Sequence, residues 1–162
     1  MQIPRPSTDA RRNWMLMAHA CAFNAVPICT AYDSLGPDGL AHSLNETEVR
    51  SMFTNADLLP TLTKIIGKCP SVKLVVYDGQ ADQKQLDELT GTREGLKAVH
   101  IDEVLKLGKE KPSEARKAKS EDIFCCMYTS GSSEWLRLVR SLTRSRNAKG
   151  CAAVPRKRHR SE

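Results

Sequence analysis

The chain has 162 residues, enough for one ordinary domain and too few for a multidomain enzyme. Its hydrophobic fraction of 40% and charged fraction of 27% are typical of a globular protein and exclude disorder along the whole chain. The net charge of +6 is unevenly distributed, because residues 133–162 contain nine Lys or Arg and two Glu, a net charge of +7. Residues 1–132 therefore carry a net charge of −1, and a basic surface for nucleic acid or anionic lipid is expected only in the last segment.

The six cysteines predict reduced thiols rather than disulfides or metal ligands. Met1 to Arg12 is polar and contains proline, so it does not resemble a secretory signal peptide. There is no CxxC motif, and the histidines show no ligand spacing relative to the cysteines, so we expect no zinc site. No apolar run approaches the ~20 residues that span a bilayer, so any membrane association is expected to be peripheral.

Helical and strand patterns alternate from Asn13 to Ser132. The clearest strand is VKLVVYD, which is short, β-branched and bounded by turn residues. The clearest apolar helical stripe is formed by Leu58, Leu62, Ile65 and Ile66. The expected helices cover residues 13–27 (mostly buried), 33–48 (with Leu40 and Leu44 on one face), 55–69, 80–90 and 102–110, and the expected strands cover residues 28–32, 49–54, 72–78, 97–101 and 123–130.

Two of these helices begin with capping signals, Thr54 or Asn55 for the third and Asp102 for the fifth. Strands that alternate with helices of about ten to fifteen residues predict an α/β fold with right-handed βαβ units and a mainly parallel sheet. In such sheets ligands bind where strands end and loops open. The loop that follows the strand at 123–130 is therefore an expected binding site.

The segment TSGS at this position has the composition of a phosphate-binding loop. Thr129, Ser130 and Ser132 offer hydroxyl groups, and Gly131 permits a positive φ or a close backbone approach to an anion. The Walker pattern is absent, and Arg137 is the nearest following cation. On spacing alone, two interpretations remain open: a nucleotide loop, and an ordinary polar turn that leaves a buried strand.

A longer pattern favours the nucleotide loop. EDIFCCMYTSGS resembles the strand and opening of the adenylation signature of AMP-forming acyl-CoA synthetases, Tyr-Thr-Ser-Gly-Ser-Thr-Gly-x-Pro-Lys-Gly. Upstream, TAYDSLG and GLAHSLNETE are similar in order and spacing to the N-terminal part of fungal-type long-chain fatty-acid CoA ligases. The resemblance covers about residues 13–132 and implies an incomplete N-terminal subdomain of an adenylate-forming enzyme. It also implies that Thr129, Ser130, Gly131 and Ser132 contact ATP phosphate, with Tyr128 as the last strand residue before them.

The resemblance implies a reaction in two steps, in which fatty acid and ATP give an acyl-adenylate and pyrophosphate, and the thiol of CoA then displaces AMP. Mg²⁺ and the signature loop are expected to neutralise phosphate charge. The implied partners are fatty acid, ATP and CoA. The implied location is the cytoplasm or the cytoplasmic face of the endoplasmic reticulum, peroxisome or lipid droplet. No catalytic residue and no metal ligand is assigned within this chain.

The sequence departs from the family pattern after Ser132. Ser133 to Leu138 stand where Thr-Gly-x-Pro-Lys-Gly is expected, and Glu134 places a negative charge beside the phosphate loop. The remaining segments of the enzyme are missing, so we expect this chain to be inactive on its own, and the change suggests a frameshift, an unspliced intron or a mispredicted gene model. We therefore divide the chain into an unmatched segment 1–12, a partial AMP-binding domain 13–132 and a basic tail 133–162, expected to be disordered except for a possible short helix in WLRLVRSLTRS.

The alternative function is a non-enzymatic binding module with a basic tail for nucleic-acid binding or nuclear targeting. The segments RSLTRSRNAK and PRKRHR supply the charge. No aromatic residue lies among these charges after Trp135, so base stacking has little support. A solvated tail without a partner accounts for the same residues, and nucleic-acid binding is therefore disfavoured.

Overall fold

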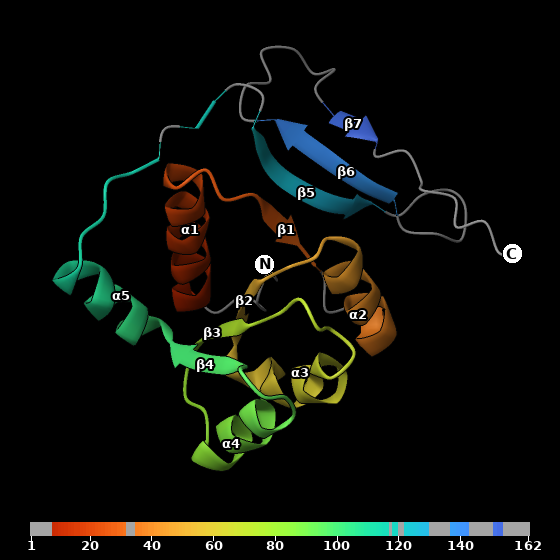
Figure 1. Cartoon of the computed structure of the whole chain (residues 1–162), viewed down its shortest axis with the longest axis vertical. Coiled ribbons are helices and arrows are strands. Elements are labelled where there is room, and N and C mark those ends of the chain that lie inside the picture. Colours follow the sequence, from red (N-terminus) through yellow and green to blue (C-terminus); the bar gives the residue numbers. More distant parts are fainter. Residues whose placement is uncertain are drawn as a thin grey trace, which may run out of the picture.

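The computed structural model describes residues 8–31, 35–116, 118–119, 122–129, 137–142 and 151–153 (Figure 1). Helices and strands alternate along the chain up to the helix that ends at Glu110, which confirms the α/β class. The helices are α1 (Thr8–Phe23), α2 (Gly36–Glu46), α3 (Leu59–Ile66), α4 (Gln83–Gly91) and α5 (Ile101–Glu110), with a 3₁₀ turn, η2 (Ala56–Leu58), before α3. The strands are β1 (Ile28–Thr30), β2 (Ser51–Asn55), β3 (Leu74–Asp78), β4 (Lys97–His100), β5 (Ile123–Thr129), β6 (Arg137–Leu142) and β7 (Cys151–Ala153).

The strands form two sheets. In the first sheet β2, β3 and β4 lie in that order, and both neighbouring pairs are parallel, as expected for strands connected by α3 and α4. In the second sheet β1 pairs in parallel with β5, and β6 and β7 follow in antiparallel pairing. The mainly parallel pairing of the α/β part is confirmed, and β1 and β2 each lie at the end of a sheet.

The sheet of β2, β3 and β4 is covered on both faces. Consecutive strand residues point to opposite faces, so Met52 and Val75 pack into one apolar cluster with α2, α3 and α4. Phe53 and Val76 pack into a second cluster, which includes Ile101 of α5 and residues of α1, β1 and β5. A parallel sheet buried on both faces needs strands that are apolar almost throughout, and VKLVVYD meets that requirement.

Helix α3 contains three of the four residues predicted to form its apolar stripe. Leu62, Ile65 and Ile66 are at most 2% exposed, whereas Leu58 lies in η2 before the helix and is only partly buried. The capping prediction for this helix is wrong. Asn55 flanks η2 without a side-chain capping bond, and α3 begins later with Pro at its start, where the missing N–H of Pro carries no penalty.

The N-terminus of α5 also differs from the prediction. Asp102 lies inside the helix, and the capping residue is His100, whose Nδ1 accepts a hydrogen bond from the Asp102 backbone N–H at 3.2 Å. The same Nδ1 atom lies 3.4 Å from Oδ2 of the Asp102 carboxylate. The His100 ring also contacts Tyr77 edge to face, with ring centroids 5.2 Å apart.

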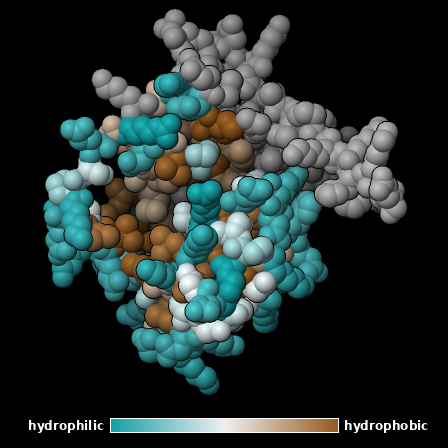
Figure 2. All heavy atoms as spheres, viewed as in Figure 1, coloured by the Kyte–Doolittle hydropathy of each residue, from teal (hydrophilic) through white to brown (hydrophobic). Residues whose placement is uncertain are grey.

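Helix α1 is less buried than its apolar sequence predicts. Asn13 and Ala18 are buried, but Met15, Leu16 and Phe23 are 49%, 42% and 66% exposed, so the expectation of a mostly buried helix is wrong. Figure 2 shows apolar atoms over α1 and the neighbouring part of α5, while the end of the molecule near α4 is mainly hydrophilic. One face of α1 packs on the second apolar cluster, and none of the described residues covers the other.

Two short strands lie in the segment expected to be a disordered tail. Arg137–Leu142 forms β6, antiparallel to β5, so the short helix expected in WLRLVRSLTRS is wrong. β7 pairs in turn with β6. The physical reason is that β5 pairs with β1 on only one edge, and an extended β6 satisfies the backbone groups on the other edge, which a local helix would leave open.

We expect Ile66→Ala to lower the free energy of unfolding by about 2–5 kcal/mol, because the side chain is fully buried and its removal leaves a cavity. Urea denaturation followed by circular dichroism measures this loss. The matched control is Lys64→Ala, an exposed position in the same helix, which is expected to change stability by less than about 0.5 kcal/mol. Equal losses in the two variants would contradict the assigned core.

His100→Ala is expected to cost about 1 kcal/mol by removing the acceptor that caps α5. His100→Asn restores a side-chain acceptor while it also loses the ring contact with Tyr77, so the difference between the two variants isolates the cap. Hydrogen exchange of the Asp102 amide gives a local readout, with faster exchange in His100→Ala than in His100→Asn. If both variants exchange at the same rate, the capping role is wrong.

Candidate functional site

The predicted phosphate loop begins at the carboxyl end of β5. Thr129 is the last residue of β5, one residue beyond Tyr128, which the family pattern implied as the last. The parallel pairing of β1 with β5 ends at Thr30 and Met127, so the loop leaves the sheet at the edge where both strands end. Ser130, Gly131 and Ser132 lie outside the described residues. The loop thus starts on the side of a parallel pair where α/β proteins bind ligands.

The antiparallel pairing of β5 with β6 adds a second feature. Thr129 pairs with Arg137, so the intervening residues, which include Glu134, connect the two strands of a hairpin. Arg137 stands at the position of the lysine in the family pattern. Its backbone lies directly across from the start of the predicted loop, a proximity that the eight-residue separation in sequence does not suggest. Glu134 itself lies outside the described residues.

A buried hydroxyl group lies at the end of β1. Thr30 is 4% exposed, and its Oγ1 has no hydrogen-bond partner in the part of the chain that the structure describes. A buried hydroxyl left without a partner costs about 1–3 kcal/mol. Sequence reasoning did not identify this residue, because it placed Thr30 inside an expected strand over residues 28–32, whereas β1 ends at Thr30.

The carboxyl ends of β2, β3 and β4 hold a second polar group that the sequence did not predict. Asn13 of α1 donates a hydrogen bond from Nδ2 to Oδ2 of Asp78 at 2.8 Å. Asp78 ends β3 and pairs with Asn55, the last residue of β2. Since the Asp78 carboxylate accepts a bond from a buried amide on α1, its evident role is to fasten that helix to the sheet.

Three of the described cysteines, Cys21, Cys69 and Cys125, are poor candidates for a nucleophilic site. Burial, together with the neighbouring thiols of Cys126 and Cys29, raises the pKa of Cys125 to about 11. Burial also raises the pKa of Cys21 and of Cys69. These three groups are therefore protonated thiols at neutral pH and poor nucleophiles. Among the described residues, no three His, Cys, Asp or Glu side chains gather to hold a metal ion.

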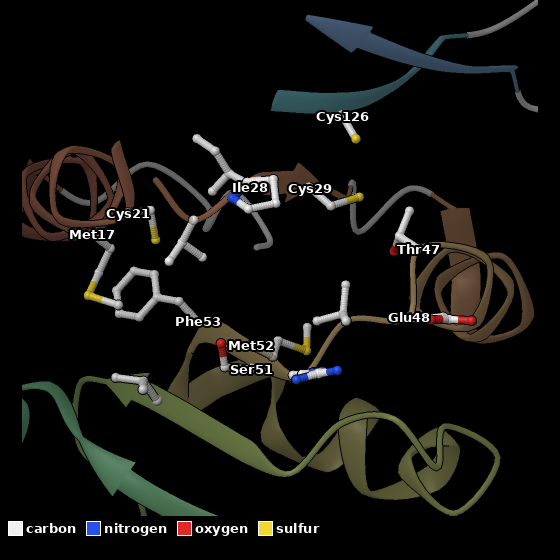
Figure 3. A pocket seen from close by; sticks show the side chains of 15 residues that line it. Met17, Cys21, Ile28, Cys29, Thr47, Glu48, Ser51, Met52, Phe53 and Cys126 are labelled. Carbon is white, nitrogen blue, oxygen red and sulfur yellow. The ribbon is translucent and has the colours of Figure 1, made fainter. Parts of the chain in front are cut away.

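A cavity of about 340 Å³ lies between the two sheets, beside β1 and β2. Figure 3 shows β1 on one side of the cavity and β2 on the other, with α1 and the α2 region at its two ends. The residues that line it are mainly apolar, and they include Met17, Cys21, Ile28, Met52 and Phe53. Its chemistry suits an apolar occupant rather than a phosphate group.

No helix in the described segments is both long enough and apolar enough to cross a bilayer.

Comparison with known proteins gives a consistent result. The AMP-binding enzyme family matches residues 8–133. Long-chain-fatty-acid–CoA ligase 2 of Schizosaccharomyces pombe is 38% identical over 119 residues, which cover 74% of this chain and 17% of that protein. Long-chain-fatty-acid–CoA ligase 1 of Saccharomyces cerevisiae is 33% identical over 135 residues, which cover 74% of this chain and 19% of that protein. The chain therefore spans less than a fifth of the length of these relatives.

The fold is also similar to that of solved structures of adenylate-forming enzymes. The A-PCP didomain of carboxylic acid reductase from Segniliparus rugosus, determined in complex with AMP, superposes with a TM-score of 0.69 at 14% sequence identity. The match covers 87% of this chain and 21% of that one. The arrangement of strands and helices resembles the N-terminal part of adenylate-forming enzymes. The chain belongs to the AMP-binding enzyme family, and its matched part is homologous to the fungal long-chain fatty-acid CoA ligases.

Proposed function

We propose that this chain corresponds to the N-terminal part of the adenylation domain of a long-chain fatty-acid CoA ligase, and that Thr129, Ser130, Gly131 and Ser132 begin its ATP phosphate loop. The observation that carries this proposal is the family match over residues 8–133, which includes the loop segment. The position of Thr129, at the carboxyl end of a strand that pairs in parallel with β1, supports it. Nothing in the comparisons favours the alternative of a nucleic-acid-binding module.

The chemistry of the proposed loop follows from its donors. Backbone N–H groups around Gly131 and the hydroxyl groups of its neighbours suit phosphate oxygens, which carry negative charge and accept hydrogen bonds. Mg²⁺ bound with ATP would neutralise phosphate charge and polarise the phosphoryl group during adenylate formation. Among the described residues, no three His, Cys, Asp or Glu side chains gather to hold this ion. Fatty acid and CoA are the other substrates that the proposal implies, at the cytoplasmic face of a membrane-bound organelle or in the cytoplasm.

We further propose that residues 13–132 form the partial AMP-binding domain, which the family match extends to residues 8–133, that the residues before and after this match lie outside it, and that the chain alone does not catalyse ligation. The chain covers 17% of a fungal ligase, so most of the relative's sequence has no counterpart here. Glu134 stands where the family pattern has glycine. A carboxylate at that position repels the phosphate groups that the loop is proposed to receive.

Glu134→Gly is expected to tighten Mg·ATP binding by at least about tenfold, whereas the unchanged chain binds no ATP at physiological concentration. A unit charge about 4 Å from a single phosphate charge costs about 1 kcal/mol even in water, and the triphosphate carries several such charges. Isothermal titration calorimetry measures the affinity. Glu134→Gln removes the negative charge without introducing glycine, so it distinguishes the effect of the charge from the effect of backbone flexibility.

The control for this experiment is a second substitution in the same loop. Ser130→Trp added to Glu134→Gly places a bulky ring in the proposed phosphate site and is expected to abolish the gain. If Glu134→Gly binds no better than the unchanged chain, or if the double variant retains the gain, then the segment does not contact ATP phosphate as proposed.

The purified chain is expected to release no pyrophosphate when it is incubated with a long-chain fatty acid, Mg·ATP and CoA. The reason is that an adenylate-forming reaction depends on groups placed around the whole substrate, and the loop supplies only some of them. A coupled pyrophosphate assay, with a full-length fungal ligase as the positive control, provides the measurement. Pyrophosphate release above the no-enzyme rate that requires fatty acid would show that the chain is catalytically sufficient.

A further inference from the structure

Two cysteines are neighbours across the parallel pair of β1 and β5. The register of these strands pairs Cys29, the middle residue of β1, with Cys126. Neighbouring strands of a sheet lie about 4.8 Å apart. Disulfides join residues whose Cα atoms lie about 4.4–6.8 Å apart, so the separation expected for the two backbones suits a disulfide. The folded chain thus brings together two thiols that are almost a hundred positions apart in sequence.

The side chains of this pair lie on the same face of the sheet. Register partners in neighbouring strands direct their side chains to one face, and both Cys29 and Cys126 line the 340 Å³ cavity. Figure 3 shows the two residues on adjacent strands, with both sulfur atoms directed towards the end of the cavity near Thr47. Both cysteines are partly exposed, so a small reagent can reach them.

A third thiol in this region, that of Cys125, is unsuited to the same chemistry. Its side chain is 6% exposed and packs in the second apolar cluster with Ile28. Burial, followed by the neighbouring thiols of Cys126 and Cys29, raises the pKa of Cys125 to about 11, so it is protonated at neutral pH and does not attack a disulfide. Because consecutive strand residues point to opposite faces, Cys125 also faces away from Cys126.

Cys21 lines the same cavity but belongs to a different element. Its side chain comes from α1, beside Met17, whereas the sulfur atom of Cys29 is directed towards the opposite end of the cavity (Figure 3). Burial raises the pKa of the Cys21 thiol as well, which lowers its reactivity at neutral pH. Cys21 therefore provides a control thiol in the same cavity.

We propose that Cys29 and Cys126 form a redox-active dithiol that exchanges with a low-molecular-weight disulfide, such as oxidised glutathione, to give a disulfide between β1 and β5. The thiolate of one cysteine attacks a sulfur atom of the small disulfide, whose S–S bond breaks to give a mixed disulfide and one molecule of glutathione. The thiolate of the other cysteine attacks the protein sulfur of the mixed disulfide and releases the second molecule of glutathione. The two cysteines lose two electrons and two protons, which reduce one oxidised glutathione to two glutathione molecules.

The disulfide would fix the pairing from which the predicted phosphate loop departs. This pairing consists of three residue pairs, and the covalent bond lies in the middle one. A cross-link between distant positions stabilises a fold mainly by restricting the unfolded chain, and the restriction grows with the length of the closed loop. Because the exchange is reversible, the pair agrees with the reduced thiols expected from the sequence and responds to the ratio of small disulfide to thiol.

The test incubates the full chain with oxidised and reduced glutathione in varied ratios and then blocks the remaining thiols with N-ethylmaleimide under denaturing conditions. As the share of oxidised glutathione rises, the intact mass is expected to show two fewer maleimide groups than the reduced chain and no attached glutathione. Trypsin should release residues 13–50 linked to residues 120–137, and dithiothreitol should separate the two peptides. The oxidised chain is expected to melt at a higher temperature than the same chain after reduction.

Matched variants assign the bond, because each of these peptides contains two cysteines. Cys29→Ser and Cys126→Ser are each expected to lower the yield of linked peptide at least about tenfold. Cys21→Ser and Cys125→Ala are expected to leave the yield unchanged, and circular dichroism shows whether each variant folds. In urea the unchanged chain is expected to form this link at least about tenfold more slowly, because the thiols are then far apart along an unfolded chain.

Four outcomes would overturn the proposal. Glutathione that stays attached to single cysteines without a link would show that the two thiols do not meet. A link that persists in Cys29→Ser or Cys126→Ser would place the bond at another cysteine. Equal rates of linking in the folded and the urea-denatured chain would show that the strand register plays no part. A covalent dimer on a non-reducing gel would show that the bond joins two chains.

Discussion

The parallel pairing of β1 with β5 is the constraint on which the arrangement of the candidate site depends. Three residue pairs, from Ile28 and Cys125 to Thr30 and Met127, join segments almost a hundred positions apart in the chain. The residues between β1 and β5 form one long connection between the two paired strands. Because the closure entropy of such an excursion grows only slowly with its length, a short pairing supported by buried side chains can hold it. The predicted phosphate loop begins two residues beyond that pairing.

The support for this short pairing comes from the packing of the first sheet. Ile28 and Cys125 belong to the same apolar cluster as Phe53 and Val76, so the face of β2 and β3 that looks towards α1 is shared with β1 and β5. The opposite face belongs to the larger cluster under α2, α3 and α4. The two clusters are separated by a single sheet, and the alternation of adjacent residues in β2 and β3 connects them. Loss of packing on either face therefore weakens the support of the loop.

The helices and strands that follow from local periodicity were mostly predicted from the sequence. The amphipathic pattern around Leu40 and Leu44 became α2, and VKLVVYD became β3. The cap of α5 was missed because an imidazole acceptor at His100 is a rarer capping group than the carboxylate two residues later. The split into two sheets was missed because strand pairing between distant segments leaves no local signal, and the same holds for β6, whose sequence is compatible with an amphipathic helix.

Less of the candidate site than of the fold could be predicted from the sequence. The family resemblance located the loop, but not the pairing of Thr129 with Arg137 across the hairpin, which depends on an antiparallel register. The hydroxyl of Thr30 and the bond between Asn13 and Asp78 were equally hidden, because each depends on which side chains meet after the sheets have formed. Short polar residues at strand ends are common, and only the folded arrangement distinguishes those that are buried.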